Sequence, residues 1–278
     1  MIKLNVITRC SRQDKFLKTL DSLNKQRYDN IKHYITYQND EILNFLQNIE
    51  FKHETELVRV PNLKKIDNLS IMYELDDVRI DYLNPDWDYM NRKVILDSNH
   101  FFEEQKKSEN RKKVEVLKYE KDGFWCTTLN STMLGQSYHL PYNLFLKIAE
   151  QKVSDGWIFF LDDDDTLIDE NSLLILSDEI KKHDEDTLHI FKMKRKPDTV
   201  PSNHFFNYMK IGHPILYGEI GGSCISYHSK YKDYTMWDEW ANADYRTAKA
   251  LEKIIPKKNF FDKVIVDAYI GNGGEDKI

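Results

Sequence analysis

Four consecutive aspartates, Asp162 to Asp165, directly follow the apolar segment WIFFL at 157–161. Two neighbouring carboxylates about 5 Å apart repel each other by roughly 3 kcal/mol at an effective dielectric constant of about 20. Most acidic runs are solvated surface loops that tolerate this repulsion, but a run at the end of an apolar strand needs a partner. Because alternate residues of an extended segment point to the same side, Asp162 and Asp164 can converge while Asp163 and Asp165 turn elsewhere.

Two converging carboxylates are typical ligands of Mg²⁺ or Mn²⁺, particularly of an ion that also keeps diphosphate oxygens and water. The spacing therefore predicts that Asp162 and Asp164 bind a divalent cation. We expect this cation to be the group that relieves the repulsion within the run.

The segments that must position the aspartates alternate between strand and helix patterns. Apolar and β-branched residues predict strands at 3–8, 31–37, 55–60 and 157–161. Helical spacing predicts helices at 9–26, with Ser11 as the N-cap, at 41–49 and at 140–153. This alternation predicts an α/β fold with a mainly parallel sheet flanked by helices. Ligands of such sheets bind outside the carboxyl ends of the strands, which is where the aspartates lie.

The rest of the chain has a less regular pattern. Between about 61 and 137 the sequence is polar and charged, and we interpret this stretch as an insertion. After the aspartates, the sequence predicts a helix near 171–182, a strand at 187–195, a loop at 196–217, a glycine-rich turn at 218–223 and a last helix at about 240–251.

Composition limits the classes of function. The 278 residues carry a net charge of -6, so the clustered basic excess of a nucleic-acid-binding protein is absent. Cys10, Cys126 and Cys224 show no paired spacing, which argues against a disulfide framework or a zinc site. The sequence contains neither a signal-peptide pattern nor an apolar run of about 20 residues. These features predict a soluble cytoplasmic protein without a transmembrane segment.

Three motifs occur in a defined order: the opening segment NVITRCSRQDKFLKTLDSLNKQRYDNIKHYI at 5–35 with its Ser-Leu-x-x-Gln element, LPYN at 140–143, and the apolar strand that ends in Asp162-Asp163-Asp164. In this the sequence resembles the GT-A-fold glycosyltransferases, in particular the family 2 group of inverting enzymes that use nucleotide sugars. The likeness covers about 1–60 and 138–255. It implies one Rossmann-like GT-A domain at 1–278, with a nucleotide-sugar-binding core at 1–60 and 138–195, a charged insertion at 61–137 and an acceptor-side part at 196–278.

The resemblance also implies roles for single residues. Asp164 would ligate the metal that bridges the donor diphosphate, and Asp162 would bind the nucleotide ribose or a water on the metal. The chain departs from the family at the end of the second strand, where TYQND replaces the usual acid that reads the base. Tyr37 could stack on the base there, and Asp40 or Gln38 could bond its edge. The expected donor-binding residues are Thr8, Arg9, Tyr37, Asp40, Asn143, Asp162 and Asp163.

An inverting transfer needs a base that removes the proton of the acceptor hydroxyl. In the family this acid opens a helix well after the aspartates, and the segment MWDEWANADYRTAKAL offers Asp238, Glu239 and Asp244. Asp244 matches the family's acidic pair best, although the first member of that pair is Ala243 here. Acids at this position could instead only counter the dipole of the helix.

The resemblance thus implies transfer of a sugar, with inversion, from a UDP- or GDP-type donor to a hydroxyl of a glycan, lipid-linked or protein acceptor. Mn²⁺ or Mg²⁺ would be the cofactor. The expected location is cytoplasmic, or peripheral to a membrane where the acceptor is lipid-linked.

Other functions remain open from the sequence. FFLDDDDTL also fits haloacid-dehalogenase-like phosphatases, with Asp162 as the nucleophile and Asp164 as the acid/base, but the later Gly-Asp-x-x-x-Asp element is missing. Nucleotidylyltransferases need a glycine-rich loop after the first strand, and TRCSRQDK contains no glycine. A non-catalytic glycan- or nucleotide-binding module is the third alternative.

Overall fold

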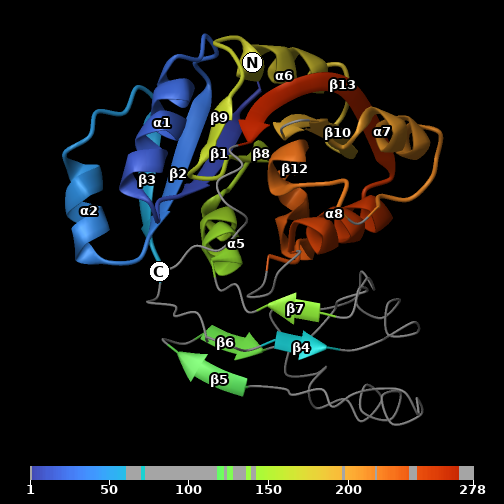
Figure 1. The fold of residues 1–278 in the computed structure, drawn as a ribbon. Helices are drawn as coiled ribbons and strands as arrows, with labels where there is room; N and C mark the ends of the chain where they lie inside the picture. The colour runs from blue at the N-terminus through green and yellow to red at the C-terminus, as the bar shows by residue number, and fades with distance from the viewer. Residues whose placement is uncertain are drawn as a thin grey trace.

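The computed structural model of the chain describes residues 2–60, 70–72, 118–121, 124–127, 136–138, 142–195, 198–216, 218–237 and 243–268. A nine-stranded sheet forms the centre of the fold, in the order β3-β2-β1-β8-β12-β10-β13-β9, with β11 paired to β10 (Figure 1). Its strands are β1 (Leu4–Arg9), β2 (Ile31–Tyr37), β3 (Glu54–Arg59), β8 (Trp157–Phe160), β9 (Asp165–Leu167), β10 (Thr187–Arg195), β11 (Asp198–Val200), β12 (Ile225–His228) and β13 (Lys257–Ala268).

The sheet is mainly parallel, as the sequence predicts. The pairings make six strands run in one direction, namely β1, β2, β3, β8, β10 and β13, while β9, β11 and β12 run in the opposite one. All four residues of β8 are buried, as expected for a central strand whose two faces are both covered.

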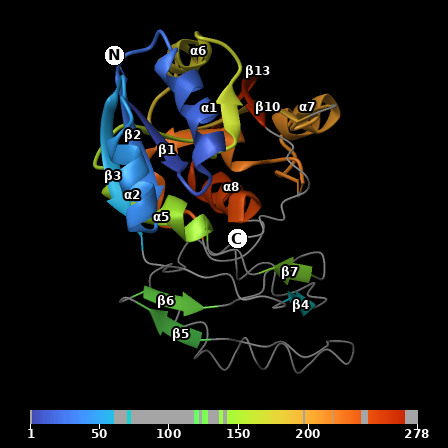
Figure 2. The same ribbon diagram turned by 60° about the vertical axis from the view of Figure 1, so that its left-hand side comes forward.

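Helices cover the sheet and connect its strands. They are α1 (Gln13–Asn24), α2 (Asp40–Gln47), α5 (Asn143–Lys152), α6 (Ser172–Ile180), α7 (Asn203–Lys210) and α8 (Ala243–Ile254). Figure 2 shows α1 and α2 in front of β1, β2 and β3. Helices α5 and α8 lie near the same end of the sheet (Figure 2). No helix among the described residues is both long and apolar enough to cross a membrane. The α/β, Rossmann-like organisation predicted from the sequence is therefore confirmed.

A glycine sets the entry into β8. Gly156 has a φ of 92°, a left-handed conformation that side chains rarely adopt. A Cβ there would also lie 2.7 Å from the backbone oxygen of Lys3. Close approach of these two backbones lets the Trp157 amide donate to the same oxygen at 2.9 Å, which starts the pairing of β8 with β1.

Three predictions about the elements are wrong. The expected loop at 196–217 contains β11 and α7, because Phe206 and Met209 of α7 are buried and Ser202 caps the helix. Strands β9 and β13 were not expected at all. Ser11 does not cap α1: the N-cap is Arg12, and its side chain makes no capping bond.

Four short strands lie within the range interpreted as an insertion. They are β4 (Ser70–Met72), β5 (Lys118–Lys121), β6 (Phe124–Thr127) and β7 (Gln136–Tyr138). They pair antiparallel as β4 with β7 and β5 with β6, separately from the central sheet. The rest of 61–137 and the Cys126 side chain lie outside the described residues. Cys10 and Cys224 are both free and buried.

Candidate functional site

The four aspartates separate into two buried and two accessible side chains. The Asp163 side chain is fully buried, whereas 42% of the Asp162 side chain and 18% of the Asp164 side chain are exposed. Asp165 is also buried. The alternation expected from an extended segment is therefore present, and Asp162 and Asp164 are the pair that a ligand can reach.

Asp163 connects the aspartate run to the turn between β1 and α1 by hydrogen bonds. Its Oδ2 accepts bonds from the backbone N of Ser11 at 2.9 Å, the Ser11 hydroxyl at 2.6 Å and the backbone N of Arg12 at 3.1 Å. Its Oδ1 pairs with the Arg12 guanidinium. Burial alone would raise the pKa of this carboxyl, but Arg9, Arg12 and Ser11 outweigh it and hold the pKa below its ordinary value. With both oxygens bound to protein groups, Asp163 positions the loop rather than facing a ligand as expected.

Asp165 connects the other end of the run to the glycine-rich turn at 218–223 by a hydrogen bond. The Ser223 hydroxyl donates to its Oδ2 at 2.8 Å, and Thr19 of α1 donates to its backbone oxygen at 2.7 Å. Burial, and then the charges of Asp162 and Asp164, raise the pKa of Asp165 well above its ordinary value. The turn at 218–223 thus touches the aspartate run through Ser223, in the 3₁₀ turn at Gly222–Cys224.

Basic side chains from the first strand and helix lie against the accessible pair. The Arg9 Nε lies 3.3 Å from the Asp162 Oδ1, and the Arg12 Nη2 lies 3.1 Å from the Asp164 Oδ1. The Lys15 Nζ lies 3.9 Å from the Asp164 Oδ2. The protein's own cations therefore offset part of the repulsion that we expected a metal to relieve.

The Asp164 carboxyl is less acidic than an ordinary aspartate in spite of these cations. Burial, followed by the charge of Asp162, raises the pKa of Asp164 against the effect of Arg12. Among the described residues, no three His, Cys, Asp or Glu side chains are grouped so that they could hold a metal ion. Asp162 and Asp164 could supply two oxygen ligands, so an ion bound there would need others from a ligand or water.

Two expected donor contacts are not available in this arrangement. Thr8 is fully buried, and its hydroxyl lies 3.0 Å from the Nε2 of His33. Burial lowers the pKa of His33 to about 3. Tyr37 is only 7% exposed and belongs to a core cluster with Phe16 and Ile42, so its ring is not open for stacking on a base.

Asp40, Arg9 and Asn143 are placed differently. Asp40 opens α2, and its exposed carboxylate forms an ion pair with Arg59 at 3.1 Å. The Arg9 guanidinium, besides approaching Asp162, lies 5.6 Å from the centre of the Tyr142 ring, within the range of a cation–π contact. Asn143 begins α5 directly after Tyr142 and is partly exposed. Arg9 and Asn143 therefore come from two elements that meet at Tyr142.

Asp244 lies in the first turn of α8, and its Oδ1 accepts a bond from the Tyr245 backbone N at 2.7 Å. Burial is the main cause that raises the pKa of Asp244, and the charge of Asp162 also raises it. Helix α8 also contacts the 3₁₀ turn at Gly222–Cys224, whose Ser223 bonds to Asp165, so this turn links α8 to the aspartate run. The other candidate bases, Asp238 and Glu239, lie outside the described residues.

Several residues of the site were missed by sequence reasoning. For Ser11, Arg12 and Lys15 the signal was the composition of TRCSRQDK, which brings three basic residues and a serine to the turn after the first strand. Only the fold shows that these residues meet carboxylates some 150 positions later. The missed residues are Ser11, Arg12, Lys15, Tyr142 and Ser223.

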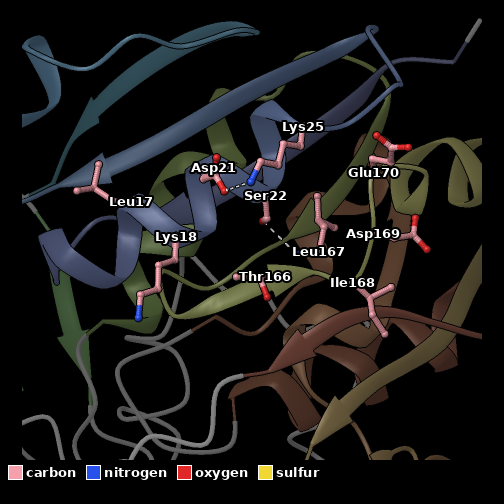
Figure 3. A pocket seen from close by; sticks show the side chains of 10 residues that line it. All are labelled: Leu17, Lys18, Asp21, Ser22, Lys25, Thr166, Leu167, Ile168, Asp169 and Glu170. Carbon is pink, nitrogen blue, oxygen red and sulfur yellow. Dashed lines mark hydrogen bonds and ion pairs between the residues drawn. The ribbon is translucent and has the colours of Figure 1, made fainter.

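A hollow of about 580 Å³ lies between α1 and the segment 166–170 (Figure 3). Its wall includes the apolar side chains of Leu17 and Ile168, which are 46% and 41% exposed. None of the four aspartates lines it, so it is separate from the accessible carboxylates.

No protein-family model and no curated protein matches the chain. Solved structures do: S. aureus TarS residues 1–349 matches with a TM-score of 0.50 and 13% identity over 96% of this chain and 60% of that one. TarS residues 1–349 in complex with UDP-GlcNAc matches with a TM-score of 0.51 and 12% identity, over 98% of this chain and 60% of that one. A longer TarS structure matches with a TM-score of 0.51 and 11% identity, over 97% of this chain and 37% of that one. The chain thus spans well under two thirds of these structures, and it shares with them a GT-A-like α/β fold.

Proposed function

We propose that the chain is a glycosyltransferase that moves a sugar, with inversion, from a nucleotide-diphosphate donor to an acceptor hydroxyl with the help of Mn²⁺ or Mg²⁺. The observation that carries this proposal is the pair of accessible carboxylates, Asp162 and Asp164, held at the carboxyl end of β8 by their buried neighbours. In an open α/β sheet this edge is where ligands bind. The fold shared with TarS, a glycosyltransferase, supports the same conclusion, because one of the TarS structures contains UDP-GlcNAc.

The donor side of the site consists of Asp162, Asp164, Arg9 and Asn143. A divalent ion bound by the two carboxylates would supply positive charge to the diphosphate that leaves. Arg9 is placed to add a positive charge next to Asp162, and Asn143 offers an amide at the first turn of α5. Because Asp163 is bound to the β1–α1 turn, its role in this proposal is to orient its two neighbours.

The acceptor side consists of α8 and the segment before it. Asp244 is the proposed base that removes the acceptor proton while the anomeric carbon is attacked from the face opposite the leaving group. Its raised pKa keeps the carboxyl a stronger base than an ordinary aspartate. The acceptor is a glycan, a lipid-linked molecule or a protein, each of which can offer a hydroxyl.

Binding experiments with UDP, GDP and Mn²⁺ test this function. Calorimetry should show that Mn²⁺ strengthens binding of one of the two nucleotides and that the nucleotide strengthens binding of Mn²⁺ by the same factor, as linkage requires. Asp164→Asn should remove the enhancement, whereas Asp178→Asn, an exposed carboxylate of α6, should leave it intact. Equal nucleotide binding in Mn²⁺ and in EDTA would contradict the metal role.

Product formation separates the proposal from its alternatives. A screen of nucleotide sugars with Mn²⁺ should give donor hydrolysis or transfer for at least one donor. A phosphatase would instead hydrolyse a generic aryl phosphate, with Asp162 as the nucleophile. Robust aryl-phosphate hydrolysis that Asp162→Asn abolishes would overturn the glycosyltransferase proposal, and nucleotide binding without turnover of any donor would indicate a binding module.

A further inference from the structure

We propose that Arg12 is a built-in counter-ion of Asp164 that weakens metal binding until the donor is present. The inference rests on the proposed function, and it assigns to Arg12 the coupling between metal and nucleotide. It follows from the contacts of the guanidinium with Asp163 and Asp164.

Arg12 is held in place independently of any ligand. It is the N-cap residue of α1, and its backbone N donates to Asp163 at 3.1 Å. Its guanidinium pairs with the Oδ1 of the fully buried Asp163 and, through the same Nη2 atom, approaches the Oδ1 of Asp164 at 3.1 Å. The Arg12 side chain is only 17% exposed. The guanidinium therefore has a fixed position on one oxygen of Asp164.

A divalent ion that uses Asp164 has to share that oxygen with Arg12 or displace it. The opposite oxygen has the Lys15 Nζ at 3.9 Å, and Arg9 lies 3.3 Å from Asp162. An incoming cation thus meets positive charge at both accessible carboxylates, and like charges at such distances repel. A diphosphate brings negative charge that attracts the ion and the guanidinium groups together, so donor binding removes the penalty for the ion.

This arrangement gives a reciprocal coupling between metal and donor. The part of that coupling that Arg12 supplies can be removed by substitution, because Arg12→Gln deletes the charge and keeps the backbone bond to Asp163. Breaking the pair of Arg12 with Asp163 lowers stability, but Asp163 retains both of its bonds from Ser11 and has the Arg9 Nε at 3.8 Å from its Oδ1, so the buried carboxylate keeps donors and a cation. The loop should therefore keep its shape in the variant.

The test measures Mn²⁺ binding to the protein alone by electron paramagnetic resonance, and then again with UDP or GDP. We expect Arg12→Gln to tighten Mn²⁺ binding without nucleotide by about 10-fold, and to reduce the nucleotide-induced gain by a similar factor, within the usual range of coupling between sites. Arg12→Lys keeps a positive charge, but as a compact and strongly hydrated ammonium with a different reach, and its effect should be intermediate. Arg27→Gln is the matched control, since Arg27 pairs with Glu170 at the surface and should not change Mn²⁺ binding.

The outcomes distinguish this inference from the proposed function. If the unaltered protein shows no linkage between Mn²⁺ and either nucleotide, the proposed function fails, and the inference fails with it. If the linkage is present and both Arg12 variants, folded by circular dichroism, bind Mn²⁺ alone no more tightly than the unaltered protein, the role of Arg12 is overturned. Tighter Mn²⁺ binding in the Arg27→Gln control would also overturn it, because the effect would then be one of net charge.

Discussion

Four chemically identical residues have different roles because each side chain has a different environment. Asp163 is buried against Ser11 and Arg12, Asp165 is buried against Ser223, and Asp162 and Asp164 remain accessible. The sequence predicts this alternation because it depends only on local backbone geometry. It does not predict that Arg9, Arg12 and Lys15 neutralise part of the charge, since those contacts join segments that are far apart in the chain.

The Asp163 carboxylate should be important for stability. Asp163→Asn breaks a buried ion pair with Arg12, which typically costs about 3–5 kcal/mol in the free energy of unfolding. The folded-state pKa of Asp163 is lowered, so its stabilising contribution is present above the unfolded pKa of about 4 and is lost as the pH falls through the lower folded value. Urea denaturation at several pH values measures both effects. Asp162→Asn, whose side chain is 42% exposed, should change stability by less than about 1 kcal/mol.

Asp244 should control the rate of transfer rather than donor binding. Asp244→Asn keeps the shape and removes the basicity, so kcat should fall by about 10²–10⁴-fold with little change in nucleotide affinity. Because the pKa of Asp244 is raised, the rate of the unaltered enzyme should increase with pH through a value above that of an ordinary carboxyl. Steady-state kinetics across pH measures both.

The neighbouring acids provide the control for this assignment. Asp238→Asn and Glu239→Gln should have smaller effects on kcat than Asp244→Asn. Near-normal transfer by a folded Asp244→Asn protein, together with an inactive variant at Asp238 or Glu239, would move the base to that neighbour.

At the scale of elements, α1 and the residues just after it hold the aspartate segment through a row of polar side chains. Thr19 donates to the backbone of Asp165, and Ser22 accepts from the Leu167 N at 3.1 Å. Gln26 donates to the Asp169 oxygen at 2.7 Å and accepts from the Leu173 N at 3.0 Å. These bonds explain the Ser-Leu-x-x-Gln element of the sequence, because Ser22 and Gln26 fix the backbone that follows the aspartates.

Replacing Gln26 should therefore destabilise the fold. Gln26→Leu leaves the buried Leu173 backbone N without its partner, which costs about 1–3 kcal/mol, whereas the Asp169 oxygen keeps its bond from the Ser172 N at 3.3 Å. Lys25→Gln, at the position before Gln26, removes only the exposed pair with Asp21 and should change stability by at most about 0.5 kcal/mol. Chemical denaturation of the two variants compares them. Equal stability of both would contradict the proposed role of the row.

Prediction of the elements succeeded where the pattern was local and failed where it was not. Strands β2 and β10 were predicted with the bounds observed, because both segments, IKHYITY and TLHIFKMKR, are rich in apolar, aromatic and β-branched residues. Strand β9 has three residues and exists because it pairs with β13 about a hundred positions later, which no local pattern shows. The helix α7 did carry a local signal, Phe206 and Met209 three residues apart after the Ser202 cap, but the surrounding His, Asn and Pro residues favoured a loop.

At the scale of the whole molecule, a buried polar network connects the donor side with α8. Glu150 of α5 lies 3.2 Å from the Lys147 Nζ and accepts bonds from Tyr227 and Thr235. The residue after Thr235 is Met236, whose backbone N donates to the Thr247 hydroxyl of α8 at 3.0 Å. The network thus ties α5, β12 and α8 together, so that Asn143 and Asp244 belong to one rigid frame.

Removing both charges of this network should cost less than the sum of the costs of removing each one. Lys147→Met leaves Glu150 buried without its cation, and breaking such a pair typically costs about 3–5 kcal/mol. The double variant Lys147→Met with Glu150→Leu should be less destabilised than the sum of the two single variants. A double-mutant cycle by urea denaturation measures this difference, and additive costs would show that the two side chains are independent.

The register of β13 decides where a reporter group can sense the site. Ala268, at the end of β13, is paired with Asp165, so a group attached to this residue lies next to the aspartate run. Leu4, by contrast, is paired with Trp157 at the start of β8, which is a strand length, roughly 15 Å, from the aspartates. A fluorescent reporter on Ala268 would therefore stand close enough to sense what the site takes up, whereas the same reporter near Leu4 would be a distant control.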